Sequence, residues 1–242
     1  MPMLFVAIVI FAGIASAFAG ALIHAAAVRL PAELSVFGVP ICAKCGTPEP
    51  TLAFIPGWSG ACASCGARDQ RLRWATEAAA SVLVMTALIV HGLTLVGLAV
   101  ALFNLVLLLI LRIDWQHHLI FVTTIVPGIM LALVLAVLRS PAALLSATIA
   151  GVGAGILFAL FFVLAMLIYK QQALGFGDIL LAVLIGTMTG VRSIFPALFI
   201  GMVLAAVGGL LLIAIGLRTR RDYIPYGAYL CAGTIFVLIA YR

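Results

Sequence analysis

The chain has 242 residues, of which 66% are hydrophobic and 8% are charged, and its formal net charge at pH 7 is +6. Its mean hydropathy is +1.36. A soluble domain needs a polar surface that this composition cannot supply, so that class of protein is excluded. The composition predicts an all-α polytopic membrane protein.

Long apolar runs divide most of the chain into candidate membrane helices. A spanning helix needs roughly 17 to 25 apolar residues. About eight runs approach this length, near residues 3–28, 75–91, 93–111, 119–138, 142–168, 177–190, 194–217 and 224–241, the sixth being short. No Lys or Arg precedes the first run, and the run exceeds an ordinary signal-peptide core. We therefore expect residues 1–28 to form an uncleaved first transmembrane helix.

Residues 29–74 break the apolar pattern and contain Cys42-Ala-Lys-Cys45 and Cys62-Ala-Ser-Cys65. Two CxxC pairs at this separation are typical of a four-thiolate zinc site, in which each pair forms a knuckle. A glycine follows each knuckle, Gly46 and Gly66, as a tight turn favours. Four protein ligands leave no open position for a substrate, so the zinc is expected to be structural. Two disulfides or free thiols are the alternatives, and a reducing compartment disfavours the disulfides.

The basic residues predict the orientation of the helices. With eight spans, the odd-numbered loops share one side of the membrane. They carry ten of the thirteen basic residues, namely Arg29, Lys44, Arg68, Arg71, Arg73, Arg112, Lys170, Arg218, Arg220 and Arg221. Because cytoplasmic loops are enriched in Lys and Arg, we expect the cysteine loop in the cytoplasm and both termini outside. The net charge is then an orientation signal that also attracts membrane lipids, and no nucleic-acid partner is expected.

Two aspartates, Asp114 and Asp178, each lie against the end of a long apolar run. A carboxylate beside hydrocarbon is costly, so an acid at this depth indicates function. The third span exits to the cytoplasm and the sixth enters from it, which lets the two carboxyl groups meet at one membrane face. Gly175 and Gly177 precede Asp178 and allow a sharp turn and the close approach of another chain.

Two carboxyl groups held close together share a proton, so that one activates water as a base while the other donates a proton. This is the chemistry of aspartic proteases. Alternatively, each acid only caps a helix or pairs with a neighbouring base, such as Arg112 beside Asp114. An ion-coupled membrane transporter would also place two acids in a helical bundle. A zinc-loop scaffold without catalysis is a further alternative.

The chain resembles the type IV prepilin peptidases, a family of GxGD membrane aspartic proteases. The resemblance rests on Gly20 to Pro31; the paired CxxC knuckles; Arg73-Trp74 with Glu77; Ile113-Asp114 and His117; Gly175-Phe176-Gly177-Asp178 followed by Gly186 and Gly190; and Ile224-Pro225-Tyr226-Gly227 with Tyr229-Leu230. It implies that residues 75–242 form a seven-helix peptidase core in which Asp114 and Asp178 are catalytic. Gly175, Gly177 and Glu77 are the expected supporting residues, although Glu77 alternatively forms an ion pair with Arg73, four residues earlier.

The resemblance also implies a substrate and a location. Members of the family remove the basic leader from type IV prepilins or type II secretion pseudopilins at the cytoplasmic face of the bacterial inner membrane. Pilus or type II secretion machinery is therefore an expected partner. Many members with a cysteine loop also N-methylate the new N-terminus, using S-adenosylmethionine. The nearest alternative is a GxGD intramembrane protease with other substrates.

Four positions depart from the family pattern. Phe121-Val122 stands where the family usually has Pro-Asp, Leu180 where it has Lys, and His24 where it has Asn. These changes remove polar groups but spare both acids and both glycines, so proteolysis is expected to survive them better than methylation. We expect His24 and Asn104 to form hydrogen bonds between helices.

Overall fold

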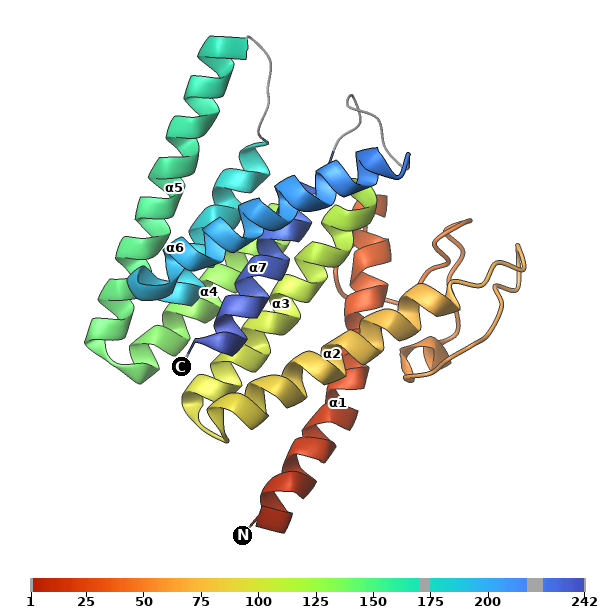
Figure 1. Cartoon of the computed structure of the whole chain (residues 1–242). Helices are drawn as coiled ribbons and strands as arrows, with labels where there is room; N and C mark the ends of the chain where they lie inside the picture. The colour runs from red at the N-terminus through yellow and green to blue at the C-terminus, as the bar shows by residue number, and fades with distance from the viewer. Residues whose placement is uncertain (1, 170–174, 217–223, 242) are drawn as a thin grey trace. The chain divides into compact units, whose positions relative to one another are not determined.

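The computed structural model describes residues 2–169, 175–216 and 224–241, and this part of the chain is helical (Figure 1). The helices are α1 (Pro2–Arg29), α2 (Gln70–His91), α3 (Leu95–His117), α4 (Val122–Arg139), α5 (Pro141–Tyr169), α6 (Phe176–Ala214) and α7 (Tyr226–Ala240), with short 3-10 helices η1 (Leu30–Ala32) and η2 (Thr51–Phe54). Six of the described helices are long and apolar enough to cross a membrane, and α7 is a shorter apolar helix. The all-α membrane fold is therefore confirmed.

The expectation of eight spans is an overcount, because two of the expected runs belong to α6. This helix has 39 residues and is interrupted at Gly190, whose φ of 69° and ψ of 175° are not helical. The Ser146 hydroxyl of α5 accepts a 3.0 Å hydrogen bond from the Val191 N–H at the break. A positive φ favours glycine, so two helical segments of α6 meet at Gly190 without an intervening loop. The basic residues Lys170, Arg218, Arg220, Arg221 and Arg242 lie outside the described residues.

The chain forms two compact units, Met1–Ile113 and Asp114–Arg242. In the first unit, α1 packs against α2, and Ile23, Ala80 and Leu108 from α1, α2 and α3 form a buried apolar cluster. A Cβ atom on Gly20 would lie only 2.6 Å from the Cα atom of Glu77, so a glycine lets α1 and α2 approach closely. Residues 29–74 belong to this unit, and their independence as a loop domain stays a prediction.

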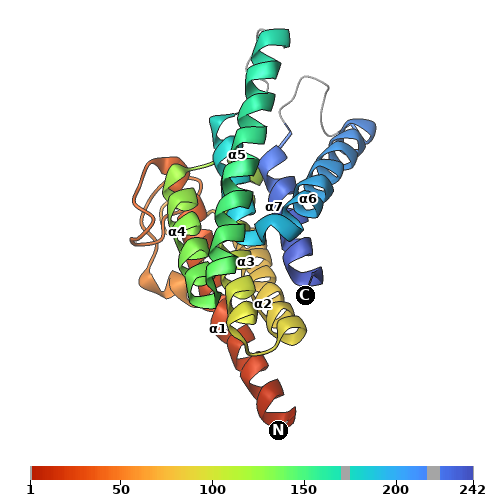
Figure 2. The same ribbon diagram turned by 90° about the vertical axis from the view of Figure 1, so that its left-hand side faces the viewer.

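In the second unit, α6 packs against α4, α5 and α7, and α4 also packs against α5 (Figure 2). Glycines again mark the closest contacts: Gly186 of α6 faces the backbone of α5 at Ala150, and Gly233 of α7 faces Gly201 of α6. The unit begins at Asp114, so it also contains the last turn of α3. Both candidate catalytic acids therefore lie in one compact unit.

Candidate functional site

Asp114 lies in the last turn of α3 and is only 4% exposed. Its Oδ2 atom accepts a 2.7 Å hydrogen bond from the N–H of Ala228, in the first turn of α7. The first N–H groups of a helix have no partner within it and carry partial positive charge, so they stabilise a carboxylate. The beginning of α7 therefore supplies a fixed donor to this acid.

Asp178 lies in the first turn of α6 and forms a cap with Gly175. Its Oδ2 atom accepts the N–H of Gly175 at 3.0 Å, while its own N–H donates to the carbonyl oxygen of Gly175 at 3.1 Å. Helix capping, the alternative role considered for these acids, is thus observed for Asp178. A cap and a catalytic role are compatible, because the cap fixes the orientation of the side chain.

Ile120 packs beside both acid-bearing segments. A Cβ atom on Gly177 would lie 2.8 Å from Ile120 Cβ, and one on Gly227 would lie 3.0 Å from Ile120 Cδ1 and 3.1 Å from Asp114 Oδ2. Because Gly177 and Gly227 have no side chain, both segments can pack closely against Ile120. This agrees with a supporting role for Gly177.

The contact at Gly227 leads to a prediction. Gly227→Ala is expected to displace the Asp114 carboxyl group by a few tenths of an ångström and to reduce the rate of peptide cleavage by about 10-fold to 100-fold, because catalysis is sensitive to such shifts. Gly153→Ala is the matched control, since no atom lies within 4 Å of the added methyl group. Cleavage rates of the two purified variants, compared at equal protein concentration, test this; equal rates would contradict it.

Arg112, the base that the alternative paired with Asp114, has a different partner. Its Nε atom donates to the Thr76 hydroxyl of α2 at 3.3 Å. Its two terminal nitrogens are buried without a hydrogen-bond partner in the described part of the chain. Asp114 is thus held by a helix N-terminus and not by the arginine two residues before it.

Glu77 lies in the first unit, whereas both aspartates lie in the second. Its Oε1 atom accepts a 2.9 Å hydrogen bond from Nε of Arg73, and its Oε2 atom accepts the N–H of Gly57 at 2.8 Å. The ion pair with Arg73, the alternative reading, is therefore present. Both carboxylate oxygens bind groups of the first unit, and a supporting role of Glu77 toward the aspartates stays a prediction.

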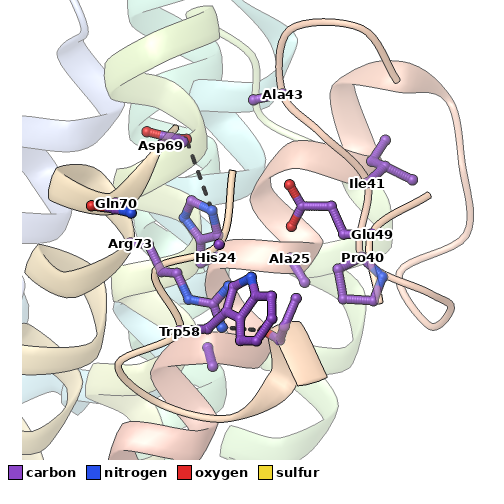
Figure 3. Close-up of a pocket in the computed structure, with 13 residues that line it drawn as sticks. His24, Ala25, Pro40, Ile41, Ala43, Glu49, Trp58, Asp69, Gln70 and Arg73 are labelled. Carbon is purple, nitrogen blue, oxygen red and sulfur yellow. Dashed lines mark hydrogen bonds and ion pairs between the residues drawn. The ribbon is translucent and has the colours of Figure 1, made fainter. Parts of the chain in front are cut away.

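A pocket in the first unit lies between α1, the cysteine loop and the start of α2 (Figure 3). Its lining includes His24, Glu49, Trp58 and Asp69, and its volume is about 30 Å³. Nε2 of His24 lies 3.8 Å from Oδ2 of Asp69, and its Nδ1 has no hydrogen-bond partner among the described residues.

The expectation of a hydrogen bond between helices was wrong for Asn104. Both polar atoms of its side-chain amide are buried without a hydrogen-bond partner in the described part of the chain.

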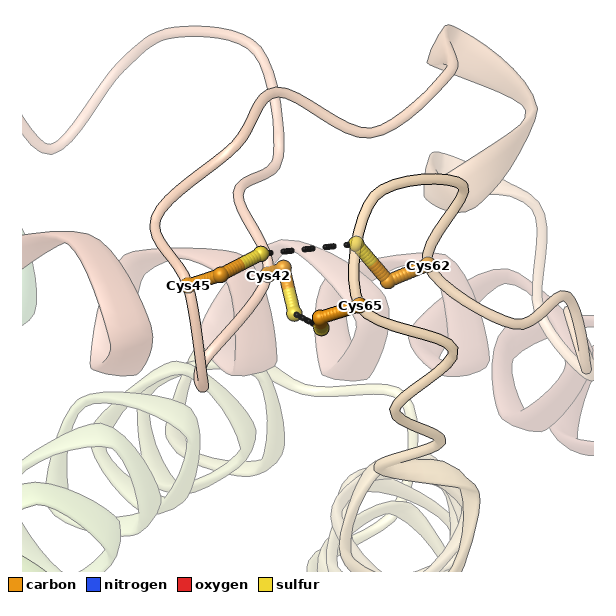
Figure 4. Close-up of side chains that lie close together, drawn as sticks. All are labelled: Cys42, Cys45, Cys62 and Cys65. Carbon is orange, nitrogen blue, oxygen red and sulfur yellow. Dashed lines mark hydrogen bonds between the residues drawn. The ribbon is translucent and has the colours of Figure 1, made fainter.

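The four cysteines of the loop converge as predicted. The Sγ atoms of Cys42, Cys45, Cys62 and Cys65 all lie within 4.8 Å of one another (Figure 4). Cys42 and Cys65 are 3.7 Å apart and Cys45 and Cys62 are 3.5 Å apart, measured between sulfurs. Sulfurs bound to one tetrahedral zinc at 2.3 Å are about 3.8 Å apart, whereas a disulfide bond is about 2 Å long. The cluster therefore has the dimensions of a metal site.

The two knuckles have the same backbone geometry. Gly46 donates to the carbonyl of Cys42 and Gly66 to that of Cys62, both at 2.9 Å. Both glycines have a positive φ, 72° and 68°, which explains why glycine follows each CxxC pair. The N–H of each first cysteine donates to the carbonyl five residues later, at Thr47 and Ala67. The repeated turn presents its sulfurs in the way a metal ion requires.

Thr47 is a site residue that the sequence analysis missed. Hydrogen bonds join its hydroxyl to Sγ of Cys45 at 2.9 Å and to Sγ of Cys62 at 3.3 Å. The hydrogen bond with Thr47 is the main cause that lowers the pKa of Cys62 to about 6, and it also lowers the pKa of Cys45. A lowered pKa favours the thiolate form that binds metal. The position of Thr47, directly after Gly46, was the available signal.

Comparisons with known proteins agree with this structure. Residues 101–210 match the model of the type IV leader peptidase family, and this range contains both aspartates. The chain is 28% identical over 227 residues to the prepilin leader peptidase/N-methyltransferase of Bacillus subtilis (strain 168), which covers 91% of this chain and 89% of the relative. No solved structure gives a significant match.

A helical membrane fold and a match across the segment that carries both acids define a membrane-embedded peptidase. Both comparisons agree with the resemblance to the type IV leader peptidases on which the sequence analysis relied.

Proposed function

We propose that this protein is an aspartic endopeptidase that removes the basic leader from type IV prepilins or type II secretion pseudopilins, with Asp114 and Asp178 as its catalytic pair. The observation that carries the proposal is the convergence on Ile120 of the segments that bear these two carboxyl groups, the end of α3 and the start of α6, within one compact unit. The name of the Bacillus subtilis relative supports the prepilin substrate.

The proposed reaction follows from two carboxyl groups that share one proton. The ionised member takes a proton from a water molecule, whose oxygen attacks the scissile carbonyl carbon. The protonated member donates to the carbonyl oxygen, and the C–N bond breaks as the leaving amine takes up a proton. The N–H groups of Ala228 and Gly175 hold one oxygen of each acid, which leaves the pair oriented before the substrate arrives.

The proposed site lies at the cytoplasmic face of the inner membrane. Asp114 ends a helix whose last turns carry Arg112, and the cysteine loop that shares this side carries Lys44, Arg68 and Arg71. The enrichment of cytoplasmic loops in basic residues supports this orientation. It matches a substrate whose short basic leader stays in the cytoplasm while its apolar helix occupies the membrane, and the pilus or secretion machinery would receive the product.

We propose zinc as the metal of the four-cysteine cluster, in a structural role, because four thiolates at these distances complete a tetrahedral shell. N-methylation is a proposed second activity, supported by the name of the relative. S-adenosylmethionine would supply the methyl group. Pockets for molecules of that size have about 300–1,000 Å³, so the 30 Å³ pocket beside His24 does not fit it, and we assign no residue to it.

Incubation of the purified protein in lipid vesicles with a full-length prepilin and S-adenosylmethionine tests these proposals. The mass of the product is expected to show loss of the leader, and an added methyl group would establish the second activity. A prepilin that stays intact, while a known prepilin peptidase cuts it under the same conditions, would overturn the proposed substrate and favour a GxGD protease with other substrates.

A further inference from the structure

A segment of the cysteine loop, residues 51–57, binds the first two turns of α2. Its contact residues are Arg73, in the first turn, and Glu77, which follows Gln70, the first residue of α2, by seven positions, or about 10 Å along the helix axis. Trp74 is 45% exposed and lies between these two contacts, and tryptophan is typical of the membrane–water interface. The segment therefore binds α2 on both sides of a residue that favours this interface.

Contacts with α1 agree with this placement. Gly20 faces the backbone of Glu77 and lies nine positions, or about 14 Å along the helix axis, before Arg29, the last residue of α1. The 3-10 helix η2 (Thr51–Phe54) also packs against α1. The segment is thus in contact with both spanning helices.

The polar backbone groups of the segment are held by one ion pair. Arg73 donates to the carbonyl oxygens of Ala53 and Ile55, and Glu77 accepts the N–H of Gly57. Arg73 and Glu77 are each only 5% exposed. Irregular backbone is tolerated at membrane depth only where its polar groups have partners, and this pair supplies them.

The side chains of the segment divide between protein and surroundings. Ala53 is buried at 1% exposure, whereas Leu52 and Ile55 are 52% and 49% exposed. The sequence from Thr51 to Gly57 contains no charged residue. Two large apolar side chains are therefore exposed on the surface of a segment that contacts two spanning helices.

We propose that residues 51–57 form a re-entrant element of the membrane domain, in which Leu52 and Ile55 contact lipid acyl chains and the Arg73–Glu77 pair holds the backbone. The cysteine loop is then anchored in the membrane. Cys42 and Cys45 of the metal cluster precede the inserted segment in the sequence, and Cys62 and Cys65 follow it. This inference depends on the two spanning helices and not on the proposed substrate or on the catalytic roles of the aspartates.

Single tryptophan probes test the contact with lipid. In a background in which Trp58, Trp74 and Trp115 are replaced by phenylalanine, Leu52→Trp and Ile55→Trp are reconstituted separately in phosphatidylcholine vesicles brominated on the acyl chains. Both probes are expected to be quenched by the brominated lipid at least half as strongly as Val82→Trp, a 61% exposed position of α2. They are expected to resist acrylamide, a quencher dissolved in water.

Ser64→Trp, at an exposed position between two cysteines of the second knuckle, is the water-facing control. A zinc content of one ion per chain verifies the fold of each variant. Acrylamide quenching of Leu52→Trp and Ile55→Trp equal to that of Ser64→Trp would overturn the proposal. Protection from both quenchers would also overturn it, because another protein surface would then cover the segment.

The ion pair is tested in the Leu52→Trp background. Glu77→Ala removes the acceptor of the Gly57 N–H and is expected to lower quenching by brominated lipid by at least twofold. Glu77→Gln keeps an oxygen at that position and is the matched control, with a smaller change. Unchanged quenching in Glu77→Ala would show that the pair does not hold the segment.

Discussion

Asp114→Asn and Asp178→Asn are each expected to abolish cleavage of a prepilin leader, with rates reduced by about 10⁴-fold or more, as is found when one member of a catalytic group is removed. Asparagine has nearly the shape of aspartate but can neither take a proton from water nor donate one as an acid. Its side-chain oxygen still accepts the N–H of Ala228 or of Gly175, so the helix ends that meet here should stay in place. The loss is therefore expected in catalysis and not in folding.

The measurement is the initial rate of leader removal by purified protein in lipid vesicles, read from product mass. Glu33→Gln, at an exposed acid after the first helix, is the matched control and is expected to cleave like the parent protein. Unfolding temperatures within a few degrees of the parent would exclude misfolding as the cause. If either aspartate variant cleaved at the parental rate, that residue would not belong to the catalytic pair.

Removal of zinc is expected to disorder residues 42–65 while the helices of the membrane domain persist. Binding of structural zinc contributes about 10–16 kcal/mol of apparent free energy in zinc-finger peptides. Cys42→Ser, or complete chelation, should therefore release the turns that Gly46 and Gly66 close through hydrogen bonds to the preceding cysteines. Helix content should change little, because all four ligands lie in this loop.

Hydrogen exchange of the amides of residues 41–48 and 61–67, measured with and without chelator, tests this expectation together with the zinc content per chain. Cys231→Ala is the control, since Cys231 is buried in α7 and is not one of the four cysteines of the cluster, so its replacement should leave zinc bound. Slow exchange at the knuckles after complete loss of zinc would show that the loop folds without its metal.

The sequence was sufficient for the membrane fold, the cysteine cluster and the choice of the two aspartates. Each depends on a local property: apolar length for the spans, CxxC spacing for the knuckles, and the cost of charge beside hydrocarbon for Asp114 and Asp178. Local properties of this kind need no knowledge of which helices are neighbours. The catalytic role of the two acids stays a prediction that the experiments above test.

The number of membrane spans could not be predicted from local sequence properties of this kind. Gly190 looks like a helix end in the sequence, and in the structure two helical segments of α6 meet there without a loop, with the Val191 N–H bound by Ser146 of α5. Only packing between α5 and α6 provides that partner. The same limit applies to Asn104, whose polarity predicts a hydrogen bond that no neighbouring helix offers in the described residues.

The tertiary structure alone decided which groups hold the functional side chains. The beginning of α7 donates to Asp114 across 114 residues of sequence, and Arg73 and Glu77 hold a loop segment that follows α1. In the sequence, these two residues looked like an orientation signal and a candidate active-site residue. Their partners are backbone groups, which every residue carries and which no pattern of side chains distinguishes. The sequence thus determined which residues have the chemistry, and packing determined what each of them contacts.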